Sequence, residues 1–326
     1  MTSSFQPSIS QAQVAALPMH SPAEFEARIA ALWVFPIKSC AGISVQQAVL
    51  TPTGLAHDRA WMVVDADGEM VTQRELPRMA LVQPELVDLG VGLAELVLHA
   101  SGMAALHLPL TTDGCFVQAT NHSASPEAHA INVRVWDDPV PAFDMGAEVS
   151  KWLTEFLGSS LGPLRLVRFD PKHQRVSNAK WTQGLTSLNQ FSDGFPVLVA
   201  SAASLDELNA RLAQQGVPAV DMRRFRANVV LAGVQAHDED RVGVMTIATG
   251  ADAVLLNPVK PCPRCPIPNI NPDTALATHA VNDTLQTYRQ DTRVKGAITF
   301  GMNAIVLRGV GQVLRVGQRV TADWTF

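Results

Sequence analysis

The chain has 326 residues, which is enough for two domains or one large one, and 47% of them are hydrophobic while 17% are charged. This composition excludes a disordered chain, and a net charge of −5 excludes a global basic field that would recruit a nucleic-acid polymer. The chain contains only four cysteines, too few for a secreted disulfide framework, so we expect a cytoplasmic protein. No apolar run in the sequence approaches the roughly 18 residues of a membrane span.

The first predicted element is a polar tail. Residues 1–23 carry no acidic or basic side chain except His20, and serine and glutamine interrupt the apolar stretches, so this segment does not match a signal peptide. We therefore expect residues 1–25 to form a disordered tail.

After the tail, the pattern predicts short strands. The stretch ALWVFPIKSCAGISVQQAVL indicates two strands around a loop, and HDRAWMVVDADGEMVTQRE indicates a hairpin. Asp67-Gly68 supplies the positive φ angles that a two-residue turn requires. Short apolar segments continue over 81–110 and 115–143, and strands at this spacing favour a barrel or a sandwich.

Two helices are predicted in the middle of the chain. The first has apolar residues at spacings of three and four: Val149, Trp152, Leu153, Phe156 and Leu157. The second is expected to begin with a capping box of Ser204 and Glu207 and to end at Gly216. Its apolar stripe consists of Leu205, Leu208 and Leu212.

The C-terminal part of the chain returns to strands. FRANVVLAG, VGVMTIATG and ADAVLLNPV each predict a strand, and AIVLRGVGQVLRVGQRV predicts paired strands around Gly309 and Gly311. We place the domain boundary near Gly146, with an N-terminal β domain over 26–145 and a mixed domain with helices over 146–326.

The segment VKPCPRCPIPNINPDTA, residues 259–275, is the strongest candidate for chemistry. Its prolines stiffen the loop, and Lys260 and Arg264 favour the thiolate forms of Cys262 and Cys265. Three other interpretations stay open: half of a zinc site, a redox Cys-x-x-Cys pair, or a chance pair in a loop. The sequence lacks the glycine-rich dinucleotide, Walker and nucleophile-elbow motifs.

Other segments gather donors of the kind that bind phosphate. FPIKSC contains Lys38 and Ser39, and HDRAW contains Arg59. MRRFRAN adds further donors where a strand is predicted to begin: Arg223, Arg224, Arg226 and Asn228. Arginine offers phosphate a bidentate fork, but for each cluster taken alone a solvated surface is the favoured interpretation.

In their order along the chain, these segments resemble the MOSC family of molybdenum-cofactor proteins, and within it the amidoxime-reducing group. The matching stretches are LWVFPIKSCAGISV, HDRAWMVVDADGEMVTQRELPRM, FSDGFPVLVASAASLDELNARL, FRANVV, KPCPRCPIPNINPDTA and the closing VLRVGQRV. The resemblance implies a mainly β fold of the α+β class. It implies an N-terminal MOSC-type β-barrel domain plus a larger MOSC β-barrel domain with peripheral helices.

The resemblance also implies a site for the molybdenum cofactor, Mo-molybdopterin. Cys265 matches the thiolate that ligates molybdenum, and a thiolate is a soft donor that suits a metal with other sulfur ligands. Cys262 is not expected to be a ligand. The positions that match cofactor-binding residues are Lys38, Ser39, Arg59, Asp193, Gly194, Arg226, Asn228 and Arg264. Gly194-Phe195 stands where the mitochondrial members have Thr-Ser, so backbone amides are expected to replace hydroxyls there.

The activity implied by the resemblance is reduction of small N-hydroxylated compounds, which consumes two electrons and two protons and releases water. The plant-type Cys-x4-Cys-x2-Cys spacing of a [2Fe–2S] domain is absent from the sequence, so we expect a separate ferredoxin or reductase to deliver electrons. The alternative is a binding module that carries the cofactor or its sulfur without catalysis. A third interpretation is a barrel that lost its cofactor, which the presence of Cys265, Arg226 and Asn228 disfavours.

Overall fold

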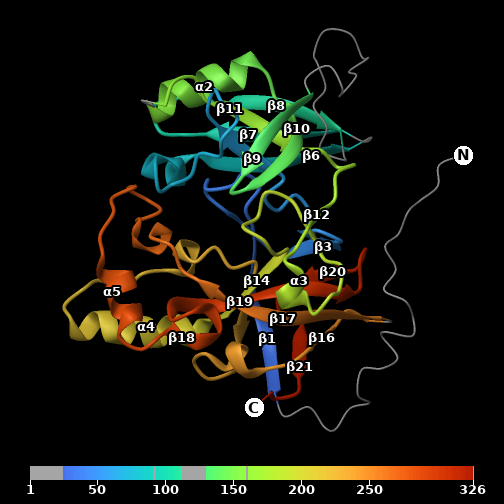
Figure 1. The fold of residues 1–326 in the computed structure, drawn as a ribbon, viewed down its shortest axis with the longest axis vertical. Coiled ribbons are helices and arrows are strands. Elements are labelled where there is room, and N and C mark those ends of the chain that lie inside the picture. Colours follow the sequence, from blue (N-terminus) through green and yellow to red (C-terminus); the bar gives the residue numbers. More distant parts are fainter. Residues whose placement is uncertain (1–24, 91–92, 112–129, 159–160, 251, 326) are drawn as a thin grey trace, which may run out of the picture.

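The computed structural model describes residues 25–90, 93–111, 130–158, 161–250 and 252–325, and strands dominate these residues. They form two lobes stacked along the long axis of the molecule (Figure 1). The expected tail lies outside the described residues except for Phe25, which is buried and begins the first strand, so Phe25 does not belong to a tail. None of the helices in the described part of the chain is long and apolar enough to cross a membrane.

A closed barrel of seven strands forms the lower lobe in Figure 1. Neighbouring strands are hydrogen-bonded in the order β14, β15, β1, β21, β16, β17 and β19, and β19 pairs with β14 to close the ring. The strands are β1 (Phe25–Val34), β14 (Val197–Ser201), β15 (Val229–Ala232), β16 (Met245–Ala248), β17 (Ala253–Pro263), β19 (Ala297–Arg308) and β21 (Arg319–Ala322). The short strands β2 (Ile43–Val45) and β18 (Gln290–Asp291) pair with β1 and β19.

Strand β1 shows why these residues form a half-buried strand. Phe25, Ala27 and Ile29 are buried while Glu26 and Arg28 are exposed, which is the two-residue period of a strand with one face in a core. The strand lies antiparallel to β15 on one side and to β21 on the other. The N-terminal strand therefore completes a barrel whose other six strands come from residues 197–322.

The upper lobe packs two antiparallel sheets and one helix around a second core. One sheet consists of β5 (Trp61–Val64), β11 (Arg165–Phe169), β10 (Asp138–Asp144) and β9 (Ala130–Val135). The other sheet consists of β6 (Gln83–Gly90), β7 (Leu93–His99) and β8 (Leu106–Thr111). A hairpin turn forms at Asp67-Gly68 as expected, but its loop has three residues and not two, since Asp65 N donates to Glu69 O at 3.0 Å. Of the predicted pair, only Gly68 has a positive φ, 82°.

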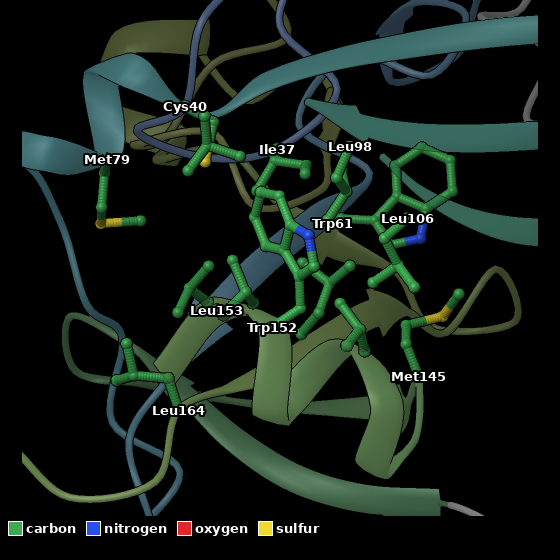
Figure 2. Close-up of a cluster of buried hydrophobic side chains, with 14 of the residues drawn as sticks. Ile37, Cys40, Trp61, Met79, Leu98, Leu106, Met145, Trp152, Leu153 and Leu164 are labelled. Atoms are coloured by element: carbon green, nitrogen blue, oxygen red, sulfur yellow. The ribbon is translucent and has the colours of Figure 1, made fainter. Parts of the chain in front are cut away.

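Figure 2 shows the core of the upper lobe, in which helix and sheet side chains interlock. Trp61 from β5 and Trp152 and Leu153 from α2 (Ala147–Leu157) contact residues of the second sheet, such as Leu98. The five apolar positions predicted for this helix are all buried, as expected. Helix α2 and β11 thus pack into the upper lobe while β1 belongs to the barrel. The expected boundary at Gly146 would separate α2 and β11 from the upper lobe against which they pack. Local composition does not indicate which hydrophobic core a segment joins.

The remaining helices lie on the outside of the barrel and the site-forming loops lie between the lobes. They are α3 (Ala179–Thr182), α4 (Ala202–Gln214) and α5 (Ala280–Gln286), with short 3₁₀ turns η1 (Pro77–Leu81), η3 (Met222–Arg224), η4 (Asp238–Arg241), η5 (Ile267–Asn269) and η6 (Thr292–Val294). The smaller sheets are β20 (Val313–Arg315) with β3 (Gln47–Thr51) and β4 (Gly54–Leu55), and β12 (Arg175–Val176) with β13 (Leu188–Asn189). The expected fold class, mainly β with peripheral helices, is confirmed.

Two local expectations are wrong. Helix α4 begins at Ala202, where Ser201 caps it by accepting a hydrogen bond from Ser204 N at 3.1 Å, so Ser204 and Glu207 are not a capping box. Glu207 instead pairs with Arg211 one turn later at 2.6 Å. The segments around Gly309 and Gly311 do not pair with each other, because β20 binds β3 while β21 binds β1 and β16.

Candidate functional site

All nine residues that the sequence singled out as a site line one cavity of about 250 Å³. They come from five turns and strand ends: the turn after β1, the residue pair before β5, the loop before β14, the segment before β15 and the loop after β17. In that order they are Lys38 and Ser39, Arg59, Asp193 and Gly194, Arg226 and Asn228, and Arg264 and Cys265. Residues far apart in sequence thus converge on one space.

The cavity wall is strongly cationic. Six of its lining side chains carry a positive charge, and Asp193 is the acidic residue among the lining residues. The cations are Lys38, Arg59, Arg74, Arg226, Lys260 and Arg264. Because the whole chain has a net charge of −5, this concentration is local and not a reflection of overall composition. Such a wall suits an anionic ligand with several acceptor oxygens.

Three of the nine residues have left-handed backbone conformations that side chains other than glycine rarely adopt. The φ angles are 66° at Ser39, 48° at Arg59 and 58° at Arg226. Each costs about 1–2 kcal/mol relative to an ordinary conformation, and such residues cluster where a fold must present particular groups. The strain therefore marks this cavity as a site, independently of any motif.

A hydrogen-bonded network fixes the two innermost arginines. Asp58, which is buried, accepts from Phe35 N at 2.8 Å and from Arg59 Nη1 at 2.5 Å. Arg59 also donates to Asn228 Oδ1 at 3.2 Å and to Arg226 O at 2.9 Å. Asn228 accepts from Leu198 N and donates to Trp33 O, which makes its amide part of the barrel wall.

Arg226 is a half-buried cation with spare donor capacity. Its Nη1 donates to Cys40 O at 2.5 Å, and its Nη2 is buried without a hydrogen-bond partner among the described residues. Burial and the neighbouring Arg59 charge lower the pKa of Arg226 to about 9. The guanidinium groups of Arg226 and Arg59 both lie against the Phe35 ring, 4.3 and 4.5 Å from its centroid. An anion in the cavity would satisfy the free donor and relieve the repulsion between the two cations.

Lys38 and Asp193 form the one acid–base pair of the lining set. The Lys38 ammonium donates to Asp193 Oδ1 at 2.5 Å and to Phe191 O at 2.9 Å. Burial lowers the pKa of Lys38 although Asp193 opposes the shift. For Asp193, desolvation would raise the pKa, but the Lys38 charge outweighs it and holds the pKa well below its usual range. Asp193 remains open to the cavity with a side chain that is 72% exposed.

Arg175, a residue outside the predicted set, holds the loop that presents Asp193. Its side chain is only 7% exposed, and its Nη1 donates to Asn189 Oδ1 at 2.6 Å, Gln190 O at 2.9 Å and Ser192 O at 2.6 Å. Its Nε donates to Asp138 in β10 at 2.9 Å. One buried guanidinium therefore ties the cavity loop to the upper lobe. Gly194 follows in this loop, and a Cβ there would meet no atom within 4 Å, so the position is open.

The cysteines of the cavity differ from the buried one beneath it. Cys262 and Cys265 both line the cavity and are partly exposed, and Arg264 Nη1 contacts Cys262 Sγ at 3.1 Å. Cys40 is fully buried, and desolvation raises the pKa of its thiol to about 12, so it stays protonated. Within the described residues, no group of three or more His, Cys, Asp and Glu side chains could hold a metal ion.

Comparison with known proteins places this geometry in a family. The model of the MOSC N-terminal beta barrel domain matches residues 26–160, and the MOSC domain model matches residues 187–321. Mitochondrial amidoxime-reducing component 1 of Mus musculus is 32% identical over 268 residues, which cover 80% of this chain and 71% of that protein. Mitochondrial amidoxime reducing component 2 of Rattus norvegicus is 33% identical over 307 residues, 90% of this chain and 82% of that protein. The chain belongs to the MOSC family, together with these amidoxime-reducing components.

Other MOSC-family relatives extend the comparison. Molybdenum cofactor sulfurase of Danio rerio is 31% identical over 287 residues, which cover 83% of this chain but only 31% of that much longer protein. The N-terminal family model runs past Gly146 to residue 160, in agreement with the packing of α2 in the upper lobe. The implied two-domain MOSC architecture is therefore confirmed.

Several cavity residues of this MOSC protein were not predicted from the sequence. Arg74 and Trp136 line the cavity from the upper lobe, and Arg175 supports it from behind. Lys260 was noticed only as a neighbour of the cysteines, yet it also lines the cavity. Arg223 and Arg224, which belong to the predicted donor cluster, line a second hollow beside the first one instead. The signal for Trp136 was an aromatic residue in a two-residue turn, where glycine or asparagine is usual.

Proposed function

We propose that this protein is a molybdenum-cofactor-dependent reductase of N-hydroxylated compounds such as amidoximes and hydroxylamines. The observation that carries the proposal is the convergence of the Cys265 thiol and six cationic side chains on one cavity in a chain of this family. The relatives named amidoxime-reducing components support the same reaction class.

The donor set fits a cofactor that combines a metal–sulfur centre with a phosphate. Buried Arg226 Nη2 and Arg264 Nε lack partners among the described residues, and buried donors without partners are rare unless a ligand completes them. Cys265 would supply the thiolate ligand, and Lys38, Ser39, Arg59, Arg226, Asn228 and Arg264 would hold the pterin and phosphate by charge-assisted hydrogen bonds. Asp193 and Gly194 would contribute from the loop before β14, with Gly194 offering its backbone.

When bound, the cofactor supplies the two-electron redox chemistry and an open coordination position. The protein's own residues orient the cofactor and the substrate and set the charge of the cavity around them. Lys38 keeps Asp193 ionised, so this carboxylate acts as an acceptor and not as a proton donor at neutral pH. The reaction balances as an amidoxime plus two electrons and two protons giving an amidine and water.

Electrons are proposed to come from a separate ferredoxin or reductase. The test uses protein produced in a molybdopterin-competent host with benzamidoxime as substrate. A chemically reduced electron donor should produce benzamidine, whereas NADH alone should give almost none. Turnover with NADH alone would refute the external partner, and no turnover with a reduced donor on molybdenum-loaded protein would refute the reductase.

The second candidate is a carrier of the cofactor or of its sulfur. The similarity to a molybdenum cofactor sulfurase over most of this chain favours it. A carrier should release its cofactor to an acceptor protein and reduce no N-hydroxylated substrate, so the same turnover assay separates the two functions.

A further inference from the structure

Trp136 occupies an unusual backbone position at the rim of the cavity. It is the first of two residues that connect β9 to β10, where Val135 pairs with Asp138. Its φ is 56°, a conformation that a bulky aromatic residue rarely adopts and that glycine adopts freely. Its side chain is nevertheless large and 41% exposed. Neither stability of the turn nor burial of the ring accounts for a tryptophan at this position.

The turn that carries Trp136 is held on both sides. On one strand, Arg134 N donates to Gly68 O at 2.9 Å and Arg134 Nε pairs with Glu69 at 2.8 Å. On the other strand, Asp138 binds the buried Arg175 that also fixes the loop of the cavity. The ring is therefore presented from a braced hairpin and not from a free loop.

Among the described residues, the indole has one cationic partner, and Trp136 is 41% exposed. The Arg74 guanidinium lies over the ring at 4.4 Å from its centroid, and Arg74 Nε is held by Thr72 Oγ1 at 3.2 Å. Arg74, Thr72 and Trp136 all line the cavity that contains Cys265. The other aromatic side chains of that lining, Phe195 and Phe225, are buried in the wall, at 8% and 0% exposure. Trp136 is thus the exposed aromatic surface among the lining residues.

We infer that Trp136, backed by Arg74, is a specificity-determining residue that stacks on planar aromatic N-hydroxylated substrates. This inference rests on the proposed reductase function. The Trp136 indole on its braced turn offers a flat surface for stacking and loses little side-chain entropy when a substrate binds. The Arg74 guanidinium stacked on the indole holds the plane of the ring in place. Substrates with an aromatic ring attached to the N-hydroxylated group would gain from the contact, and small aliphatic ones would not.

The test compares benzamidoxime with acetamidoxime, which carry the same reducible group and differ in the ring. Trp136→Gly suits the φ of 56° and should fold, which thermal unfolding checks. In the cofactor-loaded full-length chain, we expect it to lower kcat/KM for benzamidoxime about tenfold, equivalent to about 1.4 kcal/mol, and for acetamidoxime less than about twofold. Trp136→Phe should keep most of the preference. Val310→Ala, an exposed apolar residue outside the lining set, serves as the matched control.

If Trp136→Gly lowered kcat/KM equally for both substrates, or for neither, the inference would be overturned while the reductase function stayed intact. A second measurement does not need turnover. Calorimetric titration with benzamide and acetamide, which are neutral and not reducible, should show tighter binding of benzamide to the parent and no such preference in Trp136→Gly. If the parent reduces neither amidoxime, the proposed function fails. In that case the calorimetric preference for benzamide over acetamide alone tests whether Trp136 is a stacking surface.

Discussion

Replacing Arg175 by alanine tests whether one buried guanidinium holds the cavity together. Arg175 is 7% exposed and its Nη1 faces three acceptors, of which its two hydrogens can satisfy two well at one time. Hydrogen bonds from a charged donor contribute about 1.5–3 kcal/mol each, and removing one partner of a buried polar set costs about 3–5 kcal/mol. We therefore expect Arg175→Ala to lower the free energy of unfolding by about 3–5 kcal/mol.

The assay is urea unfolding of the purified variant beside Arg319→Ala as a matched control. Arg319 pairs with Glu26 at 2.9 Å, but both side chains are about 60% exposed, so its loss should cost less than about 1 kcal/mol. Arg175→Lys keeps the charge but loses the several donors of the guanidinium, so its loss in the free energy of unfolding should lie between those of the two alanine variants. A similar loss of unfolding free energy for Arg175→Ala and Arg319→Ala would show that Arg175 does not hold the cavity loop. Because the Asp193 loop relaxes, the molybdenum content of Arg175→Ala should fall as well.

Three further predictions concern stability and reactivity. Burial, together with the Arg289 charge, lowers the pKa of His237 to about 4, so the unfolded chain binds more protons below pH 6.5. Between pH 6.5 and pH 4 the free energy of unfolding should therefore drop by about 3 kcal/mol more in the parent than in His237→Gln, since the carboxyl groups titrate in both proteins. Peptide mapping after brief iodoacetamide treatment of native protein at pH 8 should find Cys40 unmodified and the two cavity cysteines alkylated; modified Cys40 would contradict its burial and its pKa of about 12. Gly54→Ala should cost more than about 2 kcal/mol in chemical unfolding, because a Cβ would lie 2.2 Å from Pro196 O at a φ of 106°, whereas Gly102→Ala meets no atom within 4 Å and should cost less.

The cysteine loop and the phosphate-type donors could be predicted because their signals are local. The proline-rich spacing around Cys262 and Cys265 and the short runs of Lys, Ser, Arg and Asn can be seen without knowledge of the fold. Each is ambiguous alone, and only their order along the chain, through the family resemblance, indicates one site. The structure then brings all nine predicted residues to one cavity. Helix α2 was equally visible, since all five of its apolar positions follow the helical period and are buried.

Features set by distant contacts could not be predicted. Strand β1 has the alternation of any half-buried strand, and nothing in it indicates that β15 and β21 are its partners. The start of α4 depends on whether Ser201 or Ser204 has the extended backbone of a cap, which the neighbouring barrel strand β14 decides. The roles of Trp136 and Arg175 could not be predicted, because they arise from the approach of two lobes and not from the neighbours of these residues in sequence.

The molybdenum content of protein made in a molybdopterin-competent host tests directly whether Cys265 is the metal ligand. Parent and Cys262→Ala should contain similar amounts of molybdenum, because one cavity thiolate is the ligand, whereas Cys265→Ala should lose most of it. Equal molybdenum in Cys265→Ala and the parent would contradict the assignment of Cys265, and with it the proposed use of the cavity.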